Sequence, residues 1–214
     1  MMWMRMPGES WPAGAMQFIG MWIVMMIAMM LPSVLPMLWS YRQLAAAANR
    51  ERSGLLTLLA GSAYFFVWAL LGAVVFLLGT TLAALEMQVP SMARAIPAAA
   101  GIVVTIAGAL QFSAWKSRSL ICCRILPLCC DGSIGTARAA WRIGVRLGLR
   151  CVHCCLGMTA VLVVIGVMDL RAMAVLTAAI SAERLAPAGQ RVARLTGAAT
   201  LNFGMVLTVR AAIA

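Results

Sequence analysis

Charged residues are scarce in this sequence, and acidic residues most of all. Only 11% of the 214 residues are charged and just six are Asp or Glu, whereas 64% are hydrophobic. Soluble domains are about a quarter charged and about half apolar, so a soluble protein of this length could not bury so much apolar surface. The composition therefore predicts a single integral membrane domain over residues 1–214, with the lipid bilayer as its surroundings.

Histidine is also scarce, and the common catalytic motifs are missing. His153 is the one histidine of the chain, which excludes a haem held by two histidines of the same chain. The sequence contains no G-x-G-x-x-G, no phosphate-binding loop, no Ser/His/Asp set and no H-E-x-x-H. No motif therefore requires catalysis.

Most of the sequence consists of long apolar runs. Their continuity favours helices over alternating strands, and most are near the roughly 20 residues that cross a bilayer. We therefore expect an all-α, polytopic transmembrane bundle of about six helices. The expected segments are 16–40, 55–79, 95–115, 144–168, 170–186 and 193–213. The fifth is short and contains Glu183 and Arg184.

Basic residues are distributed unevenly between the two sides of this bundle. The net charge of +11 would suggest nucleic acid in a soluble protein. In a membrane protein, basic residues collect in cytoplasmic loops, so no nucleic-acid partner is expected. With the six helices above, 13 of the 17 basic residues fall on one side. This places the Cys-rich loop 116–143 in the cytoplasm and both termini in the periplasm.

All seven cysteines lie in one short part of the chain, and three of them share a helical turn. Cys151, Cys154 and Cys155 stand at i, i+3 and i+4, on the face that carries Gly144 and Gly148. The glycine spacing allows a close helix crossing, so the thiols are expected to point into the bundle and converge. Reduced thiolates are soft metal ligands. The alternative is that these cysteines are only small packing residues.

The other face of this helix is basic. His153 continues the stripe of Arg142, Arg146 and Arg150, so we expect it at the membrane interface rather than as a ligand. Arg150 also precedes Cys151, and a nearby positive charge favours the thiolate.

A second cysteine cluster precedes this helix, in ICCRILPLCCD at residues 121–131. Pro127 favours a turn within it. A loop that returns onto the helix could add Cys122 or Cys123 to the three thiols and complete a metal site. The spacing is not that of a zinc finger or zinc ribbon.

The first predicted helix carries a row of thioethers at helical spacing. Pro32 and Pro36 lie in the same helix and are expected to kink it. A kinked helix lined with methionine could conduct a soft cation, although methionine also fills irregular apolar gaps. Thioethers and thiolates both select copper(I). The candidate thioether ligands are Met25, Met26, Met29 and Met30.

Five segments together resemble a known bacterial family of predicted metal-binding integral membrane proteins, a domain of unknown function sometimes labelled a copper chaperone. They are WIVMMIAMMLPSVLP (22–36), QFSAWKSRSLICCR (111–124), CVHCCLGM (151–158), GVMDL (166–170) and AERLAP (182–187).

The resemblance implies a multi-helix protein of the bacterial inner membrane that handles copper. It extends to the candidate ligands that match the family motifs, which are Cys123, Cys151, Cys154, Cys155, Met25, Met26, Met29 and Met30. Two positions depart from the family. Ser119 stands where a cysteine is usual and Leu156 where a tryptophan is common, so Cys122 would have to supply the missing thiol.

Three functions remain open from the sequence. The first is binding of a soft metal, copper(I) or alternatively zinc, for delivery, insertion or transport to a metal-accepting protein. The second is a structural or assembly subunit of a larger membrane complex, in which the Cys/Gly face only packs. The third is a membrane thiol oxidoreductase.

Overall fold

The chain is described by a computed structural model that covers residues 11–48, 50–124, 135–167 and 169–213. Every regular element in these residues is an α-helix, which confirms the all-α class. The helices are α1 (Trp11–Ala48), α2 (Ser53–Gln88), α3 (Pro90–Leu110), α4 (Ala114–Arg124), α5 (Ala137–Ile165), α6 (Leu170–Leu185) and α7 (Gly189–Ile213).

Fewer helices meet the requirements of a membrane span than the six expected. By length and composition, α1, α2, α5 and α7 are long and apolar enough to cross a bilayer. A fifth span is possible if α3 and α4 count as one broken element, because they meet at an angle of 66°. Helix α6, which covers the expected segment 170–186, has only 16 residues and is too short to span a membrane alone. The number six is therefore not confirmed.

The break between α3 and α4 corrects the expected segment 95–115 and the start of the expected loop 116–143. Helix α3 ends at Leu110, and the N–H of Gln111 already bonds to the Gly108 carbonyl three residues back. The Ser113 hydroxyl then accepts a hydrogen bond from the N–H of Lys116 at 3.3 Å, which caps a new helix. Residues 114–124 are therefore helical rather than loop, and residues 125–134 of the expected loop lie outside the described residues.

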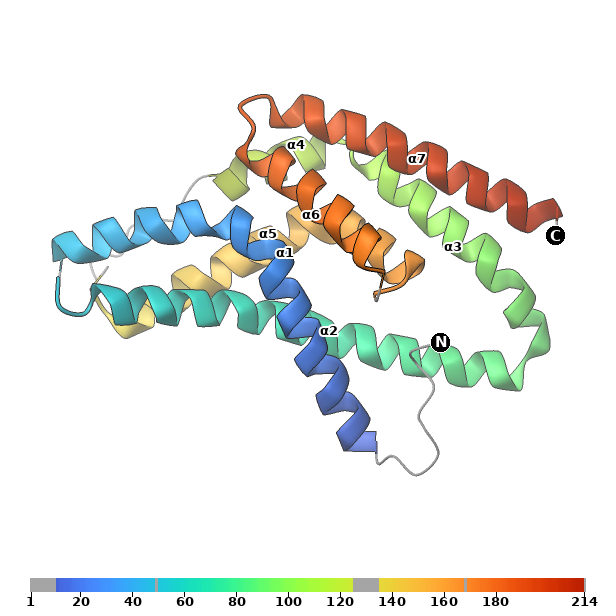
Figure 1. The fold of residues 1–214 in the computed structure, drawn as a ribbon, viewed down its shortest axis with the longest axis horizontal. Helices are drawn as coiled ribbons and strands as arrows, with labels where there is room; N and C mark the ends of the chain where they lie inside the picture. The colour runs from blue at the N-terminus through green and yellow to red at the C-terminus, as the bar shows by residue number, and fades with distance from the viewer. Residues whose placement is uncertain (1–10, 49, 125–134, 168, 214) are drawn as a thin grey trace.

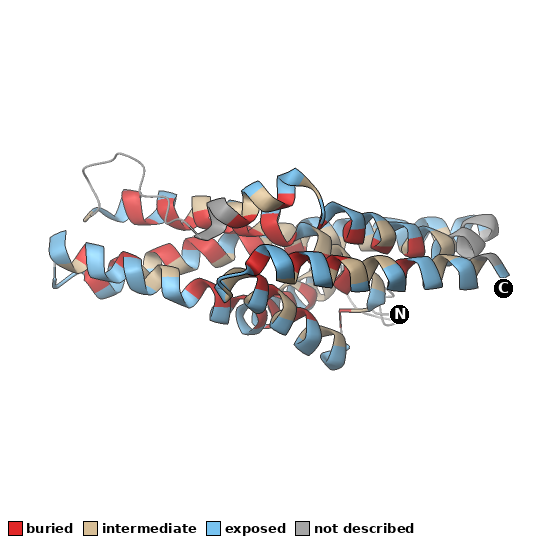
Figure 2. Ribbon diagram, turned by 90° about the horizontal axis from the view of Figure 1, so that it is seen from above, coloured by how far each residue is buried: buried red, intermediate tan, exposed pale blue. Residues whose placement is uncertain are grey.

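The helices pack in two groups that share α5. Helix α2 runs beside α1 and α5, while α3 packs along α7 over the other part of the molecule (Figure 1). Helix α1 changes direction along its length (Figure 1) and contains Pro32 and Pro36, as the expected kink requires. Buried residues concentrate where the groups meet, and the outward faces are exposed (Figure 2). Gly166, at φ +126°, ends α5 in a conformation that favours glycine.

Glycines on α5 set the closest helix crossing beside the cysteines. A Cβ at Gly144 would overlap the carbonyl oxygen of Ala60 on α2, and one at Gly148 would meet Val67 at 2.9 Å and the Tyr64 carbonyl oxygen at 3.0 Å. The expected close approach at these two glycines is confirmed, and the neighbouring helix is α2 of the same chain.

This crossing predicts an effect of adding a single methyl group. Gly144→Ala should destabilise the folded protein by about 1–3 kcal/mol, because the new Cβ meets backbone that cannot move without shifting α2. Gly54→Ala is the matched control, since nothing lies within 4 Å of that position, and it should be neutral or slightly stabilising because alanine favours helix. Thermal unfolding of both variants in the same detergent measures the difference. Equal melting temperatures would show that the crossing is looser than described.

Candidate metal centre

The three thiols of α5 all lie inside the protein. Cys151, Cys154 and Cys155 are 1%, 3% and 2% exposed, because the glycines one and two turns earlier hold this face of the helix against α2. All three are free thiols. The predicted inward orientation of this face is confirmed.

The methionine row of α1 faces the same core. Met25, Met26, Met29 and Met30 are at most 5% exposed and belong to one buried cluster with the three cysteines and Met158 of α5. A hydrogen bond of 3.0 Å from the Trp22 indole nitrogen to the Trp68 carbonyl oxygen fixes α1 against α2 beside this cluster.

One contact joins the two sulfur-bearing helices. The Sγ atom of Cys151 lies 3.9 Å from the Sδ atom of Met30, although the two residues are 121 positions apart in the chain. The hydroxyl of Tyr64, on α2, donates a hydrogen bond of 2.9 Å to the same Sγ atom. Cys151 therefore sits between a thioether and a phenol, with all three side chains buried.

The cysteines are linked to one another as well. Cys151, Cys154 and Cys155 belong to one buried cluster. Across the described residues, however, no group of three or more His, Cys, Asp and Glu side chains is arranged to hold a metal ion. Among the described residues the three thiols therefore do not form a complete site by themselves. The methionine sulfurs of α1 lie beside them, and the side chains of Cys122 and Cys123 lie outside the described part of the structure.

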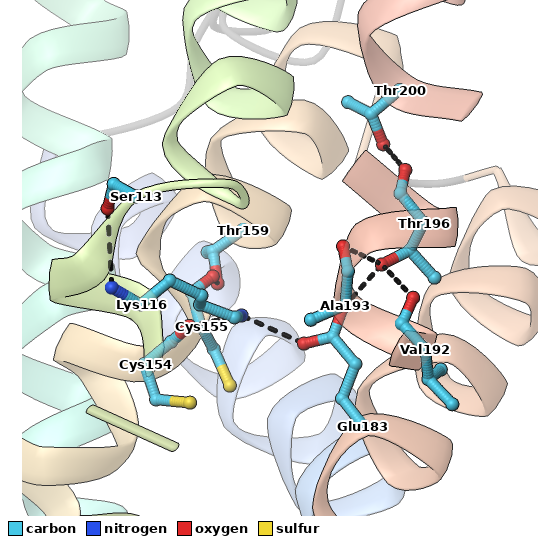
Figure 3. Close-up of polar contacts among 10 residues, drawn as sticks. All are labelled: Ser113, Lys116, Cys154, Cys155, Thr159, Glu183, Val192, Ala193, Thr196 and Thr200. Carbon is cyan, nitrogen blue, oxygen red and sulfur yellow. Dashed lines mark hydrogen bonds and ion pairs between the residues drawn. The ribbon is translucent and has the colours of Figure 1, made fainter. Parts of the chain in front are cut away.

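A buried ion pair lies directly beside the thiols. The Lys116 ammonium is 2.8 Å from a carboxylate oxygen of Glu183, with side chains 5% and 2% exposed, and it also donates to the Cys154 carbonyl oxygen at 2.8 Å. Thr196 on α7 donates to the other Glu183 oxygen at 2.6 Å. Figure 3 shows this network running from α4 past Cys154 and Cys155 to α6 and α7. Four helices are thus joined around the cysteine turn.

The positive charges near the thiols are not the ones the sequence suggested. Lys116 and Arg184 are the cations that act on Cys155, and Arg184 reaches across to the Ser33 hydroxyl of α1 at 3.3 Å. Arg150 instead lines a pocket on the surface. The expectation that Arg150 serves the thiols is therefore not supported, because its side chain leaves α5 on the other face.

The remaining candidates fall into two groups. Cys122 and Cys123 lie in the last turn of α4, but their side chains are outside the described part of the structure, so their role as ligands stays a prediction. His153 is exposed and contacts the Leu149 carbonyl oxygen and the Trp115 ring, so it faces away from the thiols as expected.

Sequence reasoning missed three residues of this centre. Tyr64 gave no signal, because a lone tyrosine in an apolar helix is ordinary. Lys116 is the first residue of the expected loop 116–143 and Glu183 belongs to the short fifth segment, so the sequence does not bring the two together. The signal that Lys116 and Glu183 share is that charges inside apolar segments require partners. That signal identifies the pair only once α4 is known to be a helix.

The ion pair predicts a characteristic pattern of stability changes. Lys116→Met or Glu183→Gln alone should each cost about 3–5 kcal/mol, because each leaves the opposite buried group without its partner. The double variant should lose less than the sum of the two. A double-mutant cycle on thermal unfolding in detergent gives the coupling, with Arg191→Gln on the exposed surface as control. Additive losses would show that the two side chains do not interact.

Comparison with known proteins identifies the family of this chain. Neither a curated protein nor a solved structure gives a significant match. The family model PpoB2, described as copper chaperone, matches residues 19–207, a range that contains the methionine row, the ion pair and the cysteine turn. The chain thus belongs to the PpoB2 copper chaperone family.

Proposed function

We propose that this chain is a membrane-embedded copper(I) chaperone that holds its cargo ion between the cysteine turn of α5 and the methionine row of α1. The observation that carries the proposal is the 3.9 Å approach of the Cys151 and Met30 sulfur atoms. Thiols and thioethers are the two kinds of sulfur ligand that select copper(I), and here they come from residues 121 positions apart in the chain.

The donor set favours copper(I) over zinc. Zinc sites in proteins use cysteine, histidine and carboxylate ligands, four of them in a structural site. The described residues bring no three such side chains together in a suitable arrangement, and His153 lies on the outer face. Methionine sulfur lies next to Cys151 instead, and a mixed thiol and thioether set is soft.

A hydrogen bond from Tyr64 would help to hold Cys151 as a metal-bound thiolate. The Tyr64 hydroxyl donates to its sulfur, and a hydrogen bond to the charged form stabilises it. Lys116 and Arg184 supply positive charge on the side of Cys155. Cys155 lies one turn further along α5 in the same buried cluster and would be a second thiol for the ion.

The methionine row of α1 provides a series of sulfur ligands along which the ion would move. Met25, Met26 and Met29 continue from Met30 along more than one turn of α1, all buried in the same cluster as the thiols. Weak thioether ligands in series allow a soft ion to step between neighbouring sites. In this proposal the ion is exchanged with a metal-accepting protein at the end of α1 or at the cytoplasmic end of α5 in the bacterial inner membrane.

The test is an anaerobic copper(I) titration of the detergent-purified protein against a competing chelator. Wild type should bind copper(I) stoichiometrically. Cys151→Ser and Met30→Leu should each weaken binding by about tenfold or more, which corresponds to about 1.4 kcal/mol. Met16→Leu is the matched control, because Met16 is in the same helix and 70% exposed.

The other two functions would give different results in the same preparation. Stoichiometric binding that survives both Cys151→Ser and Met30→Leu would refute the mixed site. Absence of copper(I) binding together with co-purifying subunits would support an assembly role. Thiols that exchange electrons with a quinone or thioredoxin pool would support an oxidoreductase.

A further inference from the structure

A surface pocket of about 440 Å³ lies between α4 and α5, on the side of α5 away from the thiols. It is independent of the copper proposal, because none of its lining residues belongs to the sulfur cluster. The lining consists of Trp115, Arg118, Ser119, Arg146, Leu149, Arg150 and His153.

The polar part of this lining is suited to an anion. Three arginines line the pocket together with Ser119 and His153, and none of its described lining residues is acidic. Arg146 and Arg150 are four residues apart on α5, so they present their charges side by side, and Arg118 approaches from α4. Arginine binds phosphate through two parallel hydrogen bonds.

The apolar part of the lining is suited to a lipid. Leu149 and Trp115, which line the pocket, are 47% and 42% exposed, and Leu156 continues the same outer side of α5 with 46% exposed. The arginines of α5 are confined to its first half, and the residues from Cys151 to Ile165 carry no Lys, Arg, Asp or Glu. The pocket therefore sits where basic and apolar surface meet, as lipid headgroups do at a membrane interface.

We propose that this pocket binds the phosphate of an anionic phospholipid, held by Arg118, Arg146 and Arg150, with the acyl chains lying along Leu149 and Leu156. Inorganic phosphate shares the headgroup chemistry but would make no use of the apolar side. The two sources can therefore be separated by experiment.

The experiment is native mass spectrometry of delipidated protein in detergent, titrated with phosphatidylglycerol or with phosphatidylcholine of the same acyl chains. Wild type should bind one phosphatidylglycerol about tenfold or more tighter than phosphatidylcholine. The variant R118Q/R146Q/R150Q should lose this preference. The control R50Q/R191Q/R194Q removes the same charge from exposed positions elsewhere and should keep it.

Two further arms make the result decisive. R118K/R146K/R150K keeps the charge and should keep a preference for the anionic lipid, which guards against misfolding of the glutamine variant. Sodium phosphate is added as a competitor in the millimolar range. Equal lipid binding by the pocket variant and its control would overturn the proposal. So would complete displacement by inorganic phosphate with no preference between the two lipids, which would identify a free-phosphate site.

Discussion

The arrangement of this protein depends on one buried ion pair, between Lys116 and Glu183. Removing two charges from water costs several kcal/mol each, and only close geometry with further hydrogen bonds recovers that cost. Lys116 must therefore reach Glu183 and the Cys154 carbonyl together, and Glu183 must also receive Thr196. These requirements fix α4, α6 and α7 around one turn of α5. The position of the thiols follows from them and from the glycine crossing with α2.

The same constraint gives α5 two unlike faces. Its inner face is held by α2 and the ion-pair network, so only small or apolar side chains fit there, and cysteine is both. Its outer face carries Arg146, Arg150 and His153 beside α4. The Lys116–Glu183 ion pair holds α4 against α6. This position of α4 places Arg118 and Ser119 next to the arginines of α5. Helix α4 thus contributes both to the surroundings of the cysteine turn and to the lining of the surface pocket.

Periodicity along single helices was readable from the sequence, whereas contacts between helices were not. The cysteine face, the methionine row and the outward position of His153 each depend only on 100° steps within one helix, and the structure agrees with them. The partners of Cys151 and Glu183 depend on elements 67 to 121 positions away in the chain. Helix α4 was missed because 114–124 is too polar to read as a span, and its stability comes from docking through Lys116. The role of Arg150 was misjudged because sequence neighbours on a helix point in different directions.

Charge balance explains why a mixed sulfur site suits a core without solvent. A copper(I) ion bound by one thiolate and neutral thioethers carries no net charge, so it can be buried without the large desolvation cost of an ion. Each additional thiolate would add a negative charge that the surroundings must offset. Here Lys116 and Glu183 already offset each other, so the pair adds no net charge beside the thiols. A site with few thiolates therefore costs less to bury than one with three, and it also suits a cargo that must be released again.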